Sequence, residues 1–247
     1  MGKLKIASLC LLMVLALISV SNIAYSQNAI RLDTVTVKKY GLTFKNGVVH
    51  DIEYQFIYPL AQDSIMQRIQ DDMTQKFFKT TSIMPLEKVQ SAYLHGIYKA
   101  CTDDSDDAIS PQDNPTYTLR WSAIRMINNK IIELIIQENG YWGGAHGWSD
   151  INYYCYDIAT GRQITLSSLF SKSNQAVMLG HLRRDDDDRE KSPNELTNNF
   201  LLLPKGVQFL YNEYEMGCYA DGIFSYTVKY SEINHLLKPS ALQYFYK

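Results

Sequence analysis

The chain has 247 residues and a formal net charge of −2; 46% of the residues are hydrophobic, 12% aromatic and 20% charged. This apolar content can fill a core, which excludes a disordered chain. The charge balance offers no basic excess for neutralising phosphates, and no multi-span membrane pattern is present, so a nucleic-acid-binding protein and a polytopic membrane protein are both excluded.

Residues 1–26 have the order of a secretory signal peptide. Residues 2–5 are basic, residues 6–20 form an apolar run too short to span a bilayer comfortably, and Ala24-Tyr25-Ser26 is a small-x-small site before Gln27. An uncleaved anchor is the alternative, whereas a lipoprotein is not expected because Cys10 lies early in the apolar run. Cleavage would leave about 221 residues with no membrane span, in the periplasm or secreted. The net charge would then fall from −2 to −4, because two lysines are removed.

The next part, residues 27–116, is expected to combine strands and helices. Residues 33–39 and 51–58 alternate as strands do, with Ile52, Tyr54, Phe56 and Tyr58 on one face. Ser64 is expected to cap a helix to about residue 79, whose apolar stripe is Ile65, Ile69, Met73 and Phe77. A second helix is predicted over residues 87–99, with Val89, Ala92, Tyr93 and Ile97 as its stripe, before an acidic loop at residues 102–116.

Residues 117–247 are predicted to be mostly β. Residues 117–123 and 132–136 form a hairpin about a two-residue turn at Asn128-Asn129, because Asn tolerates positive φ. That turn places Ala123 opposite Leu134 and Trp121 opposite Ile136. Further strands are expected at residues 151–157, 162–166, 200–203, 207–211 and 224–230. Helices are expected at residues 166–170, 174–184 and 231–237, and a solvated charge run at residues 183–189.

This order of elements favours an α+β fold, with a mostly antiparallel sheet packed against a few helices. No linker rich in Gly or Pro separates residues 27–116 from residues 117–247, so the two parts are expected to pack as one unit.

Three cysteines would remain after signal cleavage: Cys101, Cys155 and Cys218. In an oxidising compartment one disulfide is plausible, and Cys155 with Cys218 is the preferred pair because both flank the region with the strongest motif. Three unpaired cysteines are the alternative.

The densest unusual stretch is residues 139–148, which hold four glycines, two of the three tryptophans and His146. Glycines allow close approach and backbone shapes closed to other residues, while aromatic side chains suit sugars or a protein partner. A structural role, with a bulged strand and buried tryptophans, is the alternative.

The string Tyr-Trp-Gly-Gly-Ala-His-Gly, followed by an Asp157-x-x-Thr160-Gly161 turn, resembles the C-terminal domain of RsiV-like proteins, a family that includes a lysozyme-sensing anti-sigma factor and a peptidoglycan deacetylase. The tail agrees in order, through Tyr219-Ala220-Asp221-Gly222 and a following strand. The family usually has Pro where this chain has Cys218, in the loop expected to touch a partner. The resemblance implies an exported α+β binding domain without established chemistry.

Enzyme interpretations have less support. The five histidines form no His-Glu-x-x-His and no close pair, no Gly-x-Ser-x-Gly elbow is present, and the acidic run 103–107 lacks the glycine turn and distal glutamate of a calcium loop. No metal or cofactor is therefore expected. A cell-wall glycan hydrolase that uses Glu138, Asp150 or His146 is one alternative function, and a purely structural envelope domain is another.

The leading expectation is a non-catalytic binding domain of the bacterial cell envelope. Its partner would be a wall-directed protein such as lysozyme or a cell-wall glycan, and the acidic net charge favours a basic protein. The expected contact residues are Tyr141, Trp142, His146, Trp148, Tyr219 and Asp221.

Overall fold

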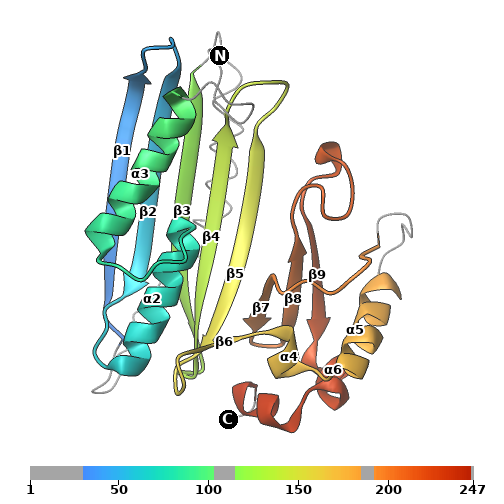
Figure 1. Cartoon of the computed structure of the whole chain (residues 1–247). Coiled ribbons are helices and arrows are strands. Elements are labelled where there is room, and N and C mark those ends of the chain that lie inside the picture. Colours follow the sequence, from blue (N-terminus) through green and yellow to red (C-terminus); the bar gives the residue numbers. More distant parts are fainter. Residues whose placement is uncertain (1–29, 103–114, 185–191, 246–247) are drawn as a thin grey trace. The chain divides into compact units, whose positions relative to one another are not determined.

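A six-stranded sheet with the order β1-β2-β3-β4-β5-β6 forms the larger layer of the computed structural model (Figure 1). The structure describes residues 30–102, 115–184 and 192–245. Only β2 and β3 run parallel; the other neighbours are antiparallel. The strands are β1 (Leu32–Thr43), β2 (Val49–Pro59), β3 (Thr116–Ile127), β4 (Ile131–Tyr141), β5 (Trp148–Asp157) and β6 (Arg162–Ile164).

Two helices between β2 and β3 cover one face of this sheet (Figure 1). They are α2 (Ser64–Phe78) and α3 (Leu86–Thr102). The predicted face of β2 is confirmed, because Ile52, Tyr54, Phe56 and Tyr58 are all buried. Phe56 stacks on Phe77 of α2 with ring centroids 4.6 Å apart. The alternation of β2 therefore determines which face the helices cover.

The ends and stripes of these helices differ from the prediction in detail. The N-cap of α2 is Asp63, whose Oδ1 accepts the Met66 N–H at 2.7 Å, so Ser64 is the first helical residue. Met66 is buried in place of Ile65. In α3, Val89 and Ile97 are buried as expected, Ala92 is exposed, and Cys101 completes the stripe.

A second, three-stranded antiparallel sheet has the order β7-β8-β9. A core of buried side chains, including Leu169, Phe170, Leu202 and Phe209, joins it to the flanking helices and to the end of the large sheet. The elements are α4 (Leu166–Leu169), α5 (Lys172–Arg184), β7 (Phe200–Leu203), β8 (Gly206–Tyr211), β9 (Phe224–Lys229) and α6 (Tyr230–Ile233), with 3-10 helices η2 (Tyr219–Asp221), η3 (Asn234–Leu236) and η4 (Pro239–Tyr244).

These elements confirm the α+β class and the mostly antiparallel sheet. Leu32–Lys247 form one compact unit, and the parallel pairing of β2 with β3 makes the large sheet continuous across the boundary expected at residue 116. The expected signal peptide, most of the acidic loop and most of the charge run lie outside the described residues. No described helix has both the length and the apolar content needed to cross a membrane.

The register predicted for the β3–β4 hairpin is wrong by one residue. Ala123 lies opposite Ile135, and Trp121 opposite Gln137. Asn128 and Asn129 do take positive φ, at 50° and 54°, but Lys130 also belongs to the turn and donates its N–H to the Ile127 carbonyl at 3.0 Å. The extra turn residue shifts the pairing by one position. Because side chains alternate with a period of two, this shift changes which residues of the two strands share a face.

In consequence, the face of β3 that carries Thr118, Arg120 and Ser122 is the one buried with the apolar residues of β4. The predicted apolar face, which carries Trp121 and Ala123, is only half-buried.

The three described cysteines are unpaired, so the expected Cys155–Cys218 disulfide is not formed. Cys218 is exposed on the loop before η2. Cys155 is buried, and its thiol donates to Glu133 Oε1 at 3.2 Å. Burial raises the pKa of the Cys155 thiol, which makes it an inert core residue.

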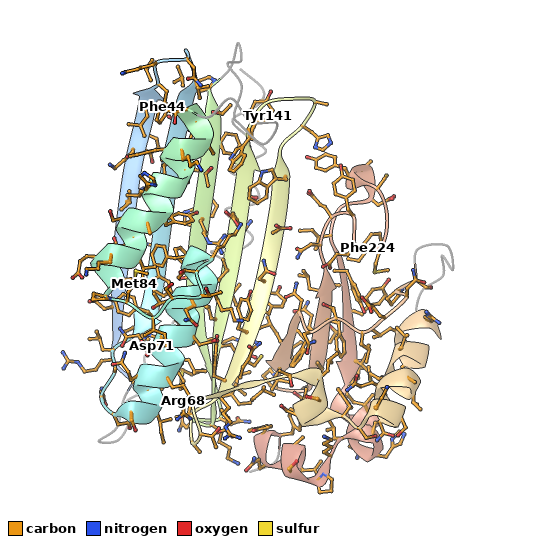
Figure 2. The ribbon with its side chains drawn as sticks, viewed as in Figure 1. Phe44, Arg68, Asp71, Met84, Tyr141 and Phe224 are labelled. Carbon is orange, nitrogen blue, oxygen red and sulfur yellow. The ribbon has the colours of Figure 1, made fainter. Side chains whose placement is uncertain are left out.

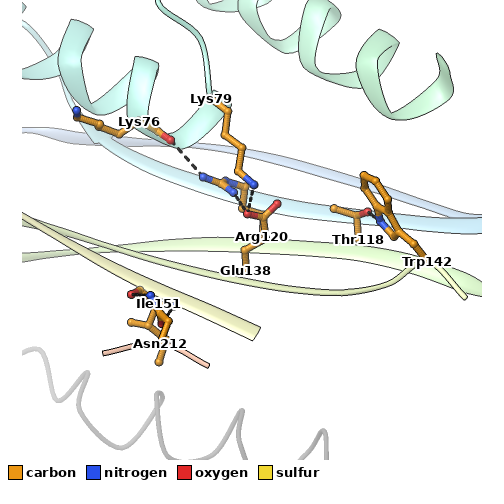
Figure 3. Close-up of polar contacts among 8 residues, drawn as sticks. All are labelled: Lys76, Lys79, Thr118, Arg120, Glu138, Trp142, Ile151 and Asn212. Atoms are coloured by element: carbon orange, nitrogen blue, oxygen red, sulfur yellow. Dashed lines mark hydrogen bonds and ion pairs between the residues drawn. The ribbon is translucent and has the colours of Figure 1, made fainter. Parts of the chain in front are cut away.

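Side chains beside the small sheet satisfy the part of the β5 edge that β6 does not reach. Asn212 accepts the Ile151 N–H at 2.8 Å and donates to the Ile151 carbonyl at 3.1 Å (Figure 3). Asn199 accepts the Tyr153 N–H at 2.8 Å and also donates to the Ile151 carbonyl, at 2.7 Å. The two amides replace a neighbouring strand, and so they close an edge that would otherwise be open.

We expect Asn212→Ala to lower the free energy of unfolding by about 2 kcal/mol, because it leaves the Ile151 N–H without its partner. Asn212→Asp keeps an oxygen for that N–H but turns a second oxygen toward the Ile151 carbonyl. The decrease in the free energy of unfolding caused by Asn212→Asp should therefore become smaller as the pH falls and the new carboxyl group is protonated. Urea denaturation of both variants at pH 5 and pH 8 tests this, and equal losses at both pH values for Asn212→Asp would contradict it.

Candidate functional site

The glycines of residues 139–148 have structural roles in the β4–β5 connection. Gly143 and Gly144 take positive φ, at 101° and 91°, in the turn. A Cβ on Gly140 would lie 2.6 Å from the Trp148 ring, and a Cβ on Gly147 would lie 2.6 Å from the Gly140 carbonyl oxygen. The glycines thus allow the tight turn and the close approach of both strand ends. The aromatic side chains remain as the source of any binding surface.

Three exposed or half-exposed rings come together where this turn meets the loop between β8 and β9. The His146 ring stacks on Tyr219, with centroids 3.7 Å apart and an interplanar angle of 15°. The Tyr214 hydroxyl lies 3.3 Å from His146 Nε2, and His146 Nδ1 lies 2.8 Å from the Gly147 carbonyl oxygen. We call His146, Tyr214 and Tyr219 the aromatic cluster. Figure 2 labels Tyr141 at the end of β4 and Phe224 at the start of β9, the strands next to the two connections that carry the cluster.

Tyr214 is the member that the sequence prediction missed. It is 62% exposed and has a positive φ of 67°, a conformation that a non-glycine residue rarely adopts. Such backbone strain persists where the surrounding structure holds it and is concentrated at functional sites. A tyrosine between two glutamates in a loop was the available signal, but only the fold places it beside His146.

The loop that carries Tyr214 and Tyr219 is acidic. Residues 212–222 contain Glu213, Glu215 and Asp221 and no lysine or arginine. Glu213 accepts the Ser149 N–H at 3.3 Å, and burial, together with the charge of Asp150, raises the pKa of its carboxyl group. Two of the three residues of the aromatic cluster, Tyr214 and Tyr219, therefore belong to a loop whose charged side chains are all acidic.

Asp221, a predicted contact residue, closes a turn. Its Oδ2 accepts the Cys218 N–H at 2.9 Å at the start of η2. Tyr141, another predicted contact, donates its hydroxyl to the Gly144 carbonyl at 3.1 Å and lies beside Tyr117. Both residues shape the loops around the aromatic cluster.

The two predicted tryptophans lie on the face of the sheet that carries α2 and α3. Trp142 is 37% exposed, and its Nε1–H donates to Thr118 Oγ1 at 3.0 Å (Figure 3). The same hydroxyl lies 3.0 Å from Nε2 of His50, which is fully buried; burial lowers the pKa of His50 to about 4. His50 is therefore neutral at pH 7. The Trp148 ring lies over Gly140.

A charged group lies on this same face (Figure 3). The buried Glu138 pairs with Arg120 and with Lys79, the latter at 2.6 Å. The Arg120 guanidinium also donates to the Lys76 carbonyl at 3.2 Å, at the last turn of α2. Asp150 lies directly opposite Glu138 on β5, and partial burial and the charge of Glu138 raise the pKa of its carboxyl group.

These positions bear on the hydrolase alternative. The structure brings Glu138 and Asp150 together, but the Glu138 carboxylate is held by two cations. Both ring nitrogens of His146 face other groups, so the histidine does not complete a catalytic set with them. A cavity of about 190 Å³ between α2 and residues 82–86 contains none of the predicted residues. Among the residues placed by the structure, no three His, Cys, Asp or Glu side chains could hold a metal ion.

Solved structures share this fold. A DUF3298 family member from Bacteroides fragilis NCTC 9343 superposes with a TM-score of 0.74 at 18% identity, covering 87% of this chain and 96% of that one. A DUF3298 family protein from Pseudomonas aeruginosa PAO1 gives a TM-score of 0.60 at 14% identity, covering 86% and 96%. No curated protein matches the chain.

Residues 162–231 match the family model described as "Protein of unknown function (DUF3298)". This segment runs from β6 to the start of α6, so it includes Tyr214 and Tyr219 of the aromatic cluster but not His146. The chain carries a DUF3298 domain, a domain of an uncharacterised family, over residues 162–231.

Proposed function

We propose that this protein is an exported, non-catalytic binding domain of the bacterial cell envelope, and that the aromatic cluster is its contact surface. The observation that carries the proposal is the stacking of His146 on Tyr219, which joins two loops from different sheets around the exposed Tyr214. Aromatic side chains with polar edges are typical anchors of protein interfaces. The resemblance of residues 141–147 to RsiV-like domains supports an envelope role.

The partner that fits this surface best is a basic wall-directed protein such as lysozyme. Glu213, Glu215 and Asp221 lie in the loop that carries Tyr214 and Tyr219, this loop contains no lysine or arginine, and the whole chain is acidic. The negative charge of this loop accelerates association with a basic partner and repels an anionic one. An anionic wall polymer is therefore the less favoured ligand.

Isothermal titration calorimetry with a c-type lysozyme and with soluble peptidoglycan fragments tests the proposal. We expect lysozyme to bind with an affinity that falls as salt rises. Tyr219→Ala, and separately Tyr214→Ala, should weaken binding by about thirtyfold or more, as truncation of an interface anchor does. Ile83→Ala, an exposed apolar side chain on the segment after α2, is the control and should bind as the wild type does.

Absence of heat with lysozyme would overturn the lysozyme proposal, and binding to the fragments alone would replace the partner with a glycan. Release of new reducing ends from peptidoglycan, lost in Asp150→Asn, would replace the binding function with a hydrolase.

A further inference from the structure

β1 forms one edge of the large sheet, where it pairs with β2 on one side (Figure 1). Within the part of the chain that the structure describes, no strand pairs with its other side. An edge strand of this length is a template for pairing with another chain unless something blocks it.

The contacts of β2 show which residues of β1 face outward. Ile57 donates its N–H to Ser122 Oγ at 2.7 Å, and its carbonyl accepts from the same hydroxyl at 3.3 Å, so its backbone groups point toward β3. Thr34 lies opposite Ile57. In an antiparallel pair, the backbone groups of Thr34 must then point away from β2, and by alternation so must those of Thr36 and Lys38. In agreement, the Thr34 N–H is bonded by the adjacent side chain of Asp33.

This outward edge is complementary to itself. If two copies pair antiparallel with Thr36 opposite Thr36, then Val35 faces Val37 and Asp33 faces Lys39, which places opposite charges together. The same register places Leu32 opposite Tyr40. These are exposed large apolar side chains, at 47% and 58%; Leu32 begins the strand, and Tyr40 directly follows its last regularly paired residue, Lys39.

Lysine side chains on an edge strand usually hinder its pairing with another chain, but the two lysines of β1 are held by contacts within their own chain. Lys38 is paired with Glu53 of its own sheet at 2.7 Å, and Lys39 donates to the Tyr98 hydroxyl at 2.8 Å. The bulge after Lys39, where Gly41 takes a φ of 64°, limits the regular edge to residues 32–39.

We propose that two copies of this chain associate through antiparallel pairing of β1 about a two-fold axis at Thr36. The outward N–H and C=O groups of Thr34, Thr36 and Lys38 then form about six backbone hydrogen bonds between the copies. Two of these replace the bond that each Thr34 N–H donates to the Asp33 side chain of its own chain. The large sheet becomes continuous across both molecules. This pairing is independent of the aromatic cluster and of the function proposed for it.

Cysteine cross-linking tests the register in the full chain with Cys10 and Cys218 replaced by serine. In the proposed register, the two Cα atoms at position 36 lie about 5.5 Å apart, within disulfide range. Thr36→Cys should therefore give a covalent dimer on mild oxidation. Thr34→Cys, matched in exposure and on the same face, should not, because its symmetry mate lies about 13 Å away along the strand.

Sedimentation equilibrium tests the pairing without cross-links. Thr36→Pro removes an outward N–H and leaves the bonds to β2 intact, so it should weaken dimerisation by about thirtyfold or more, whereas Thr36→Val should not. Asp33→Lys should also weaken it, and Asp33→Lys with Lys39→Asp should restore it. A wild-type chain that stays monomeric up to about 1 mM, or equal cross-linking at positions 34 and 36, would overturn the proposal.

Discussion

Arg125→Leu is expected to lower the free energy of unfolding by about 3 kcal/mol. Glu133 is fully buried, and both Arg125 Nε and one terminal nitrogen lie 2.6 Å from its Oε2. The other carboxylate oxygen accepts the Leu202 N–H of β7 at 2.9 Å, and Arg125 also donates to the Leu202 carbonyl at 3.1 Å. Loss of the cation leaves a buried carboxylate uncompensated where the two sheets meet. The effect is at the low end for buried pairs, because the Arg125 side chain is 35% exposed.

The pH dependence identifies the cause. Burial raises the pKa of Glu133, with Arg125 opposing the rise, so the folded state binds a proton more readily than the unfolded chain does. A raised carboxyl pKa costs stability at a pH above the unfolded value and costs progressively less as the pH falls toward that value. In Arg125→Leu, the opposing charge is gone, and the cost at pH 8 should be clearly larger than at pH 5.

Urea denaturation at both pH values measures this difference. Arg125→Leu combined with Glu133→Leu removes both charges and should recover much of the lost stability, since an apolar pair of similar volume can replace a buried ion pair. A loss for Arg125→Leu that is the same at pH 5 and pH 8, or a double variant no better than the single one, would contradict this account.

Gly140→Ala is expected to lower the free energy of unfolding by about 2 kcal/mol. The added Cβ would lie 2.6 to 2.7 Å from three atoms of the Trp148 indole, closer than packed atoms approach. The indole also lies beneath the Lys79 ammonium, 5.7 Å from the ring centroid, so its movement would disturb the pair of Lys79 with Glu138. Thermal denaturation followed by tryptophan fluorescence measures the loss.

The matched control is Gly96→Ala in α3, where a Cβ meets nothing within 4 Å. There, alanine should raise stability by up to about 1 kcal/mol, because it is the better helix former. Equal effects of the two substitutions would show that Trp148 does not press on Gly140.

The candidate site was predictable in part. His146 and Tyr219 stand out in the sequence, as a histidine within a glycine-aromatic string and a tyrosine in a loop, and the structure stacks them. Trp142 and Trp148 stand out equally, yet they lie on the helix-covered face with Thr118 and Gly140. Composition marks aromatic residues, but the face on which each lies depends on the register at the strand ends. The signal at Tyr214, a tyrosine between two glutamates in a loop, does not by itself place this residue beside His146.

The sequence by itself determined the α+β class, the buried face of β2 and much of the stripes of α2 and α3, because periods of 2 and 3.6 are local properties of the chain. Only the tertiary structure decided the β3–β4 register, where one extra turn residue moved every pair. It also decided that the Cys155 thiol donates to Glu133 and does not pair with Cys218, and that Asn212 satisfies the β5 edge. These contacts join residues that are 22 and 61 positions apart. Their partners are set by how sheets pack, and local periodicity carries no information about that.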